Sequence, residues 1–279
     1  MNHPAELAIN QYLEDATSGK STMSEETITQ IGTDVMDAMR RQFGGGKGRD
    51  EFRLRMSNIG KPTCQLWFAK NKPEEALPKP TTFVMNMLLG DIVEAAFKGI
   101  IKEAGYPYED KDNFVTLQLG DAMIKGSYDI VVDGAMDDVK SASDWSYRNK
   151  FESYDTLQKS DPFGYVGQLA GYAKASGKKV GGWWVVNKAN GNIKYVPADG
   201  LDLDEQIAKL EKTVATVTEN KFERCFAPVP ETFRGVPSGN TVLNDSCKFC
   251  DFRFSCFDIE ELPSKVSKAK TLPIVAYIK

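Results

Sequence analysis

The chain has 279 residues, of which 41% are hydrophobic and 27% are charged, and this composition indicates a folded domain rather than a disordered or membrane-spanning chain. Its 39 acidic and 35 basic residues give a net charge of −4, which by itself gives no sign of a nucleic-acid partner. The sole histidine is His3, beside the start of the chain, and this excludes most Ser-His and Cys-His nucleophile mechanisms, because they need an imidazole inside a built site.

The first part of the chain is predicted to be helical. Apolar residues recur at helical spacing over residues 24–42, before a glycine-rich stretch at 44–50 that we expect to form a mobile loop. A second helix is predicted over about residues 82–104, closed by Gly105. We expect residues 1–54 to form a helical N-terminal extension. The acidic N-terminus lacks a secretory signal, so we expect a cytoplasmic protein without membrane contact, in the host cytoplasm if the chain is phage-encoded.

Strands and helices then alternate. The predicted elements are, in chain order, strands at 114–119, 122–132 and 135–141, a helix at 163–176, a hairpin from 182–187 to 193–196, and a helix at 203–220. This order predicts an α/β fold with a central mixed sheet flanked by helices.

A tight hairpin turn is predicted at Asp133-Gly134, between two apolar alternating runs. The register that this turn sets places Asp129 opposite Asp138, and strand alternation puts Lys140 on the same face as Asp138. Two carboxylates facing each other in an apolar sheet need a compensating charge, for which Mg²⁺ is a natural candidate. The alternative is a surface hairpin with solvated carboxylates and a lysine salt bridge.

Asp129, followed by Asp138-Val139-Lys140, resembles the signature of the PD-(D/E)XK nuclease superfamily, which has an aspartate on one strand and Asp/Glu-x-Lys on the next. The D-x-K motif is common when taken singly. The resemblance implies a restriction-endonuclease-like core and one or two Mg²⁺ or Mn²⁺ ions at these carboxylates.

Two further motifs resemble the RecB-like branch of this superfamily. Gln168 and Tyr172 match its Q-x-x-x-Y motif, and their spacing puts both on one face of a helix. Gly90 and Glu94 take the place of its G-x-x-x-H motif, with a carboxylate where many relatives have histidine. The resemblance implies that Gln168 and Tyr172 contact DNA and orient the active centre. If the resemblance is set aside, Gln168 and Tyr172 are incidental polar residues of an amphipathic helix, and Glu94 is an exposed helix residue.

Cysteines form a third pattern. Cys64 and the later C-x2-C-x5-C run of Cys247, Cys250 and Cys256 resemble the iron–sulfur staple of RecB-like nucleases, including CRISPR-associated exonucleases and AddB. Four thiolates suit a [4Fe–4S] cluster, and the same four suit a structural Zn²⁺. Cys225 lies outside these segments and is expected to be a plain buried or free thiol.

The resemblance implies a Mg²⁺- or Mn²⁺-dependent DNA exonuclease acting at DNA ends or on single strands, in recombination or end processing of a phage or mobile-element type. A recombination or replication protein is a possible partner. The implied catalytic residues are Glu94, Asp129, Asp138, Lys140, Gln168 and Tyr172. The implied metal ligands are the carboxylates of Glu94, Asp129 and Asp138 with the backbone carbonyl of Val139. Lys140 would help to activate the attacking water or stabilise the developing charge.

Two alternatives remain open. One is a CRISPR-adaptation nuclease that trims spacers with partner proteins, and the other is a non-catalytic DNA-binding module with a zinc staple. The nuclease domain is expected to span residues 55–258 and to be followed by a basic tail at 259–279, which either touches a polyanion or is solvated. Residues 143–160 mix aromatic and cationic side chains, which suits either a loop that grips single-stranded DNA or a solvated linker.

Overall fold

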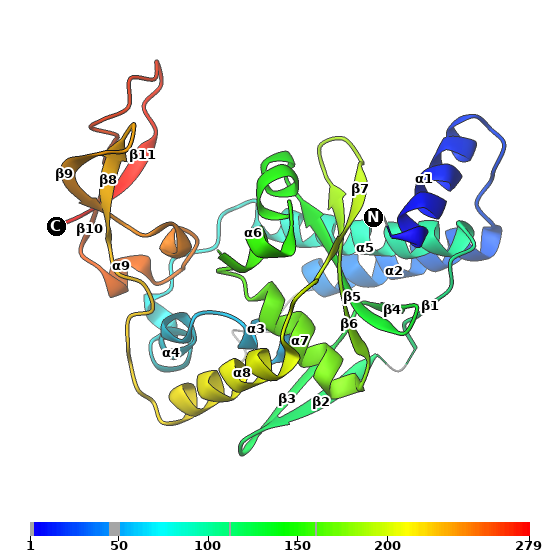
Figure 1. Cartoon of the computed structure of the whole chain (residues 1–279), viewed down its shortest axis with the longest axis horizontal. Helices are drawn as coiled ribbons and strands as arrows, with labels where there is room; N and C mark the ends of the chain where they lie inside the picture. Colours follow the sequence, from blue (N-terminus) through cyan, green and yellow to red (C-terminus); the bar gives the residue numbers. More distant parts are fainter. Residues whose placement is uncertain (1–2, 45–50, 112, 160) are drawn as a thin grey trace.

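The computed structural model describes residues 3–44, 51–111, 113–159 and 161–279 (Figure 1), so the predicted glycine-rich loop lies, apart from Gly44, outside the described residues. The helices predicted around residues 24–42, 82–104, 163–176 and 203–220 are all confirmed. The helices are α1 (Pro4–Thr17), α2 (Glu25–Phe43), α3 (Met56–Ile59), α4 (Thr63–Asn71), α5 (Phe83–Glu103), α6 (Tyr154–Lys159), α7 (Tyr165–Ser176), α8 (Leu203–Thr218) and α9 (Arg253–Cys256).

A mixed five-stranded sheet forms the centre of the fold, as predicted. Its strands lie in the order β1-β4-β5-β6-β7, and β5 and β6 run parallel whereas the other neighbours are antiparallel. The strands are β1 (Tyr108–Glu109), β4 (Ile130–Val132), β5 (Ala135–Ala142), β6 (Lys179–Asn187) and β7 (Ile193–Pro197).

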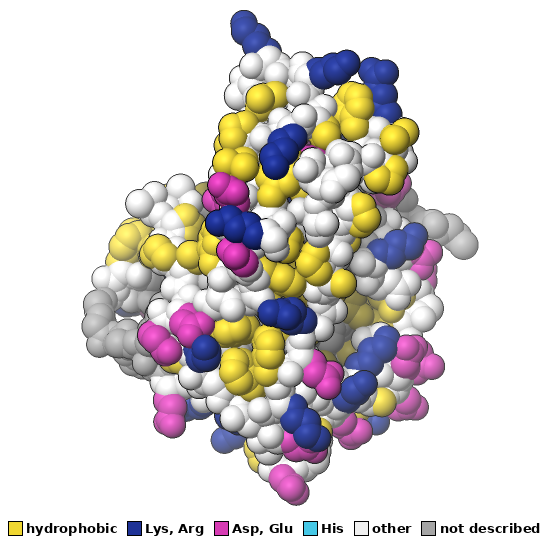
Figure 2. Space-filling view, turned by 90° about the vertical axis from the view of Figure 1, so that its left-hand side faces the viewer, with side chains coloured by type: hydrophobic (Ala, Val, Ile, Leu, Met, Phe, Trp, Pro, Cys, Tyr) yellow, Lys and Arg dark blue, Asp and Glu magenta, His cyan; other side chains and the backbone are white. Residues whose placement is uncertain are grey.

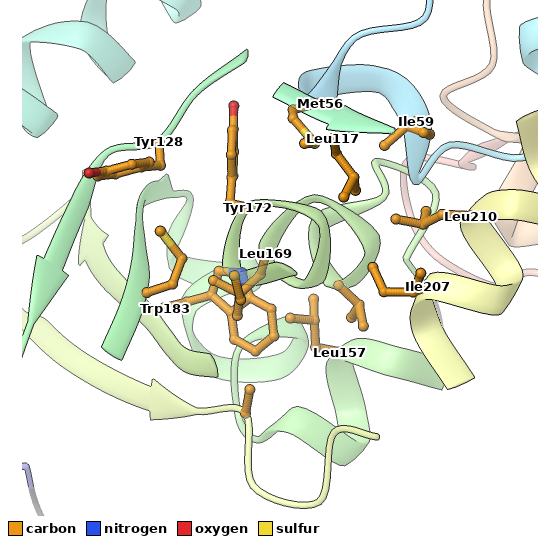
Figure 3. Packing of buried hydrophobic residues seen from close by; sticks show 14 of the residues in the cluster. Met56, Ile59, Leu117, Tyr128, Leu157, Leu169, Tyr172, Trp183, Ile207 and Leu210 are labelled. Atoms are coloured by element: carbon orange, nitrogen blue, oxygen red, sulfur yellow. The ribbon is translucent and has the colours of Figure 1, made fainter. Parts of the chain in front are cut away.

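Helices cover both faces of this sheet. On one face, α3, α7 and α8 pack around Trp183 (Figure 3), and the apolar stripe of α8 points into this core. On the other face, α1 and α5 pack against Trp184, and α2 packs on α5 (Figure 1). Both tryptophans are fully buried because adjacent strand residues point to opposite faces of the sheet. The N-terminal helices therefore contribute to one of the two cores.

The predicted single strand at residues 122–132 is wrong, because the chain changes sheets within it. Its first part, β3 (Ala122–Ser127), pairs with β2 (Phe114–Leu119) in a separate two-stranded sheet, and its last part is β4. Asn113 holds the junction, since its side-chain amide donates to the Tyr128 carbonyl and its own carbonyl accepts from the Tyr128 N–H. Asp129 follows directly and immediately precedes β4, the strand of the central sheet that pairs with β5.

The segment predicted as a basic tail, residues 259–279, contains two strands that the sequence analysis did not predict. The segment forms β10 (Ile259–Pro263) and β11 (Ile274–Ile278), which join β8 (Val229–Phe233) and β9 (Val236–Val242) in a four-stranded sheet. Lysine and arginine side chains lie at the top of the molecule, over this sheet, in Figure 2. No helix in the described ranges is long and apolar enough to cross a membrane.

Candidate active site

The hairpin between β4 and β5 has the predicted turn and register. Asp133 and Gly134 have φ values of 51° and 74°, and positive φ at both central residues is what a two-residue turn of this hand requires. The ladder pairs Val132 with Ala135 and continues to the pair that contains Asp137. The residues that come next, away from the turn, are Asp129 just before β4 and Asp138 on β5, which are the two predicted site aspartates.

Asp129 and Asp138 lie together beside Lys140. The Val139 N–H donates to Asp129 Oδ2 at 2.8 Å, which holds the Asp129 side chain across the hairpin. Asp129 is half-buried, and desolvation, with the neighbouring Asp138 second, raises the pKa of its carboxyl to about 6. Asp138 is only 3% exposed, burial raises its pKa, and its Oδ2 is ion-paired with the Lys140 ammonium. The predicted carboxylate pair is therefore a feature of the fold.

Glu94 reaches the same site from α5. The helix passes close to β5 at Gly90, where a Cβ would lie 3.7 Å from Ser141 Oγ. Burial, followed by the charge of Asp129, raises the pKa of Glu94, and its Oε1 accepts a hydrogen bond from Lys98 Nζ at 2.8 Å. Lys98 was not anticipated, although its position four residues after Glu94 is a signal for such a pair.

Gln168 and Tyr172 project from α7 toward the carboxylates. Tyr172 is buried, and its ring lies 6.4 Å from that of Tyr128, the residue before Asp129 (Figure 3). Gln168 hydrogen-bonds to the Tyr172 hydroxyl; burial raises the pKa of that hydroxyl to about 12, and the charges of Asp129 and Asp138 add to the rise. The two motif residues are thus joined to each other beside the site.

The donor set suits a hard divalent cation, since Mg²⁺ and Mn²⁺ prefer oxygen ligands. Asp138 Oδ2 is buried, and its charge partner in this structure is the Lys140 ammonium. Lys98 and Lys140 neutralise two of the carboxylates in this structure, and no group of three or more acidic, histidine or cysteine residues in the described ranges has a metal-holding arrangement. The oxygen donors available are the carboxylates of Glu94, Asp129 and Asp138 and the carbonyl of Val139.

Solvent reaches the site along a groove between α2 and α5. The groove has a volume of about 980 Å³, and Glu94 and Lys98 are among its lining residues. Its other charged side chains include both signs, such as Asp91 and Arg41, which form an ion pair of 3.1 Å. The groove therefore gives access to the edge of the site without the one-signed charge of a nucleic-acid channel.

Asp137 is a buried carboxylate that sequence reasoning missed. It points to the opposite face of β5 and is 1% exposed. Its carboxyl accepts hydrogen bonds from the Gly182 N–H, the Trp184 indole and the Tyr195 hydroxyl at 2.8, 2.9 and 2.9 Å. Burial raises its pKa to about 7, although these donors favour the charged form. A Cβ at Gly181 would lie 2.0 Å from Asp137 Oδ1, so the Gly-Gly pair in β6 makes room for this carboxyl.

The four cysteines of the predicted staple lie at one end of the molecule. Cys64 is in α4, Cys256 ends α9, and Cys247 and Cys250 lie just before α9. The Phe68 and Phe252 rings stack at 5.4 Å between these segments. Burial raises the pKa of Cys247 to about 12, with Cys250 and Cys256 adding to the rise. Cys250 and Cys256 pack in an aromatic cluster with Phe68 and Phe252, although no metal-holding arrangement forms among the four thiols in the described part of the chain.

Cys225 is a free thiol, one of the two outcomes expected, and it lies against Cys64. It is exposed, and its Sγ accepts from the Cys64 N–H at 3.1 Å and lies 3.3 Å from Thr63 Oγ1. A hydrogen bond from the Cys64 thiol, the largest cause, lowers the pKa of Cys225 to about 6. The spacing pattern could not reveal this fifth thiol, because a long loop after α8 carries it back to α4.

No protein-family model matches the chain, and no curated protein matches it. Among solved structures, that of SSO0001 is similar to it, with a TM-score of 0.44 and 12% identity over 81% of this chain and 94% of that chain. A likeness of this degree defines neither a shared fold nor a function.

Proposed function

We propose that the chain is a Mg²⁺- or Mn²⁺-dependent DNA exonuclease with a RecB-like PD-(D/E)XK core. The observation that carries the proposal is the convergence of Asp129, Asp138 and Lys140 on one side of a buried hairpin, with Glu94 facing them from α5. Three acids gathered in a largely buried site are unfavourable unless cations compensate them. Lys98 and Lys140 pair with two of them, and Asp129 has no ion pair with a described residue, so the cluster supports a cation site.

The residues suit phosphodiester hydrolysis. In this reaction the water oxygen bonds to phosphorus, one ester P–O bond breaks, and the departing oxygen takes a proton. A divalent cation bound by the carboxylates supplies Lewis-acid activation of the water and stabilises the extra charge on the phosphate. The three carboxylates would supply that ligand set, and the neighbouring Tyr172 would orient the strand.

Lys140 is suited to charge stabilisation rather than to proton abstraction. Although burial disfavours its ammonium, Asp138 and Asp129 raise its pKa above the ordinary value, so it stays charged at neutral pH. A charged ammonium can donate hydrogen bonds to phosphate oxygens that gain charge in the transition state. We assign Lys140 this role.

The cysteines support a second proposed cofactor, a [4Fe–4S] cluster, with structural Zn²⁺ as the alternative. Cys64, Cys247, Cys250 and Cys256 would be its ligands. The aromatic side chains around them would limit solvent access. Its role would be structural, because it would join α4 to the C-terminal segment.

A cleavage assay tests the nuclease proposal. Wild-type protein is incubated with single- and double-stranded DNA labelled at either end, with Mn²⁺ or with chelator. We expect Mn²⁺-dependent shortening from an end, and at least about a hundredfold slower cleavage by Lys140→Met. DNA that stays intact with Mn²⁺ and wild-type protein would refute the proposal, and equal cleavage by Lys140→Met would refute the role of Lys140.

A further inference from the structure

Lys150 lies at the end of a π-helical turn, Ser146–Lys150, that follows β5. The turn opens the segment 143–160, and the solvated-linker alternative for this segment is wrong, because Phe151 and Tyr154 are buried in the core. π-Helical turns are rare and frequently occur at functional sites. As a result, the Lys150 side chain lies against the core and is largely shielded from solvent.

The Lys150 ammonium lies between two aromatic rings. Its Nζ is 4.5 Å from the ring centroids of both Phe163 and Tyr165, and its side chain is only 12% exposed. The nearest carboxylate is Asp161, at 4.0 Å. Asp161 already accepts hydrogen bonds from two backbone N–H groups at the start of α7, at 3.0 and 2.8 Å. Within the described ranges, Lys150 therefore has a distant counter-charge and no hydrogen-bonded one.

Burying the Lys150 ammonium in this position is unfavourable for the free energy of folding. Removing a cation from water without a close counter-ion is unfavourable, and ring contacts of this kind return only part of the cost. Burial lowers the pKa of Lys150, and the nearby charge of Lys140 lowers it further. The position is therefore better suited to receiving an anion than to holding the fold together.

The same ring connects Lys150 to the candidate site. Lys140 Nζ lies 5.0 Å from the Tyr165 centroid, so both ammonium groups contact one aromatic side chain. Tyr165 is the first residue of α7, which also carries Gln168 and Tyr172. Two cations and the motif helix thus surround one corner of the site.

We propose that Lys150 binds a backbone phosphate of the DNA strand, adjacent to the phosphate at Lys140. Phe163 and Tyr165 hold its stem and ammonium in place, and the phosphate adds a hydrogen-bonded counter-charge to the 4.0 Å ion pair with Asp161. The identity of this anion as DNA rests on the proposed nuclease function. Lys150 is a strand-positioning residue, whereas Lys140 acts at the bond that breaks.

Binding of a fluorescein-labelled single-stranded dT20 tests this proposal, measured by anisotropy in EDTA over a range of salt concentrations. Lys150→Met keeps an unbranched apolar stem between the rings but removes the charge. We expect this variant to bind about tenfold more weakly, because one charge-assisted hydrogen bond is lost. The slope of log affinity against log salt concentration should also be smaller by about 0.7. Lys150→Arg should restore both, and Lys174→Met, which removes a half-exposed charge at the far end of α7, should change neither.

A thermal melt separates this role from a structural one. Because Lys150→Met removes a poorly paired buried cation, we expect its melting temperature to equal or exceed that of wild type. A lower melting temperature with unchanged dT20 binding would overturn the proposal. If Lys150→Met fails to fold, Lys150→Gln is compared in the same way, and unchanged binding by that variant would also overturn it.

Cleavage by the same proteins distinguishes this proposal from the nuclease proposal. Wild type that cleaves with Mn²⁺, alongside a Lys150→Met variant with unaltered dT20 binding, overturns the phosphate role alone. Lys150-dependent binding without any cleavage supports the phosphate role and removes the nuclease function. Wild type that does not bind dT20 overturns the phosphate role whatever the cleavage result.

Discussion

Single side chains balance the charge of the candidate site. Glu94 is paired with Lys98, and Asp138 with Lys140, whereas Asp129 accepts the Val139 N–H and has no ion pair with a described residue. Desolvation, with the neighbouring charge of Asp138 second, raises the pKa of Asp129 to about 6. Asp129 is the carboxylate that gains most from an added cation.

On the other face of β5, Asp137 fixes the position of the site strand. Asp137→Asn places an amide NH₂ among three donors, so at least one hydrogen bond is lost. We expect the free energy of unfolding to fall by about 1–3 kcal/mol, measured by urea denaturation. Tyr195→Phe removes one donor only and should cost about 1 kcal/mol. Asp137→Asn as stable as wild type would contradict this role.

Among the elements, α7 is positioned by a close approach to the residues after α3. A Cβ at Gly60 would lie 2.3 Å from the Gly164 carbonyl oxygen, and Gly164 itself has a φ of +77°. α7 can therefore start close to α3, which sets where Gln168 and Tyr172 point.

Gly60→Ala tests this approach. The added methyl group must push two backbone segments apart, so we expect a loss of about 1–3 kcal/mol in the free energy of unfolding, together with weaker DNA cleavage. Gly32→Ala is the matched control, because no atom lies within 4 Å of its added Cβ, and alanine favours a helix interior. Equal stability of the two variants would show that the close approach is not required.

The C-terminal sheet has a buried ionisable group, Glu231, on its edge strand β8. Glu231 accepts hydrogen bonds from Tyr277, Ser238 and Asn240, at 2.7, 2.8 and 2.7 Å. Although burial opposes ionisation, these donors hold the pKa of Glu231 below its ordinary value. A lowered carboxyl pKa stabilises the fold at neutral pH, and that contribution is lost as the pH falls through the folded-state pKa.

Glu231→Gln should therefore melt about 2–4 °C below wild type at pH 7. The gap should narrow between about pH 5 and pH 3, because wild-type Glu231 becomes protonated there. Circular-dichroism melts over this range provide the measurement. A gap that stays constant with pH would mean that Glu231 is not ionised in the folded protein.

Elements with a strong local signal could be predicted, and elements defined by distant contacts could not. The Asp133-Gly134 turn set the hairpin register, and helical periodicity located α2 and α8. The break at residues 128–129 has no local signal, because the residues on both sides of it favour a strand. The break is stabilised by hydrogen bonds between Tyr128 and Asn113, which is distant in the sequence. β10 and β11 were missed because a lysine-containing connection lies between them and each strand needs a partner distant in the sequence.

The same distinction applies to the site. Asp129, Asp138 and Lys140 could be placed together because one turn relates them. Lys150 and Cys225 could not be placed, because their neighbours in space come from other segments of the chain that only the folded structure brings close.

At the scale of the whole molecule, the cysteines connect α4 to the segment around α9. If they hold a metal group, closing such a long loop contributes strongly to folding. Cys250→Ser should then give poorly soluble protein and lose the absorbance at about 400 nm expected of a [4Fe–4S] cluster. Cys225→Ser should keep both properties. A soluble, fully active Cys250→Ser protein would show that the staple is dispensable.

We propose that the carboxylates beside the β4–β5 hairpin hold a divalent cation. Calorimetric titration of the purified protein with Mn²⁺ tests it most directly, with Asp129→Asn as the site variant and the exposed Asp121→Asn as the control. We predict that wild type and Asp121→Asn bind one or two ions per chain and that Asp129→Asn loses this binding. Wild type that binds no Mn²⁺, or Asp129→Asn that binds it as wild type does, would contradict the claim.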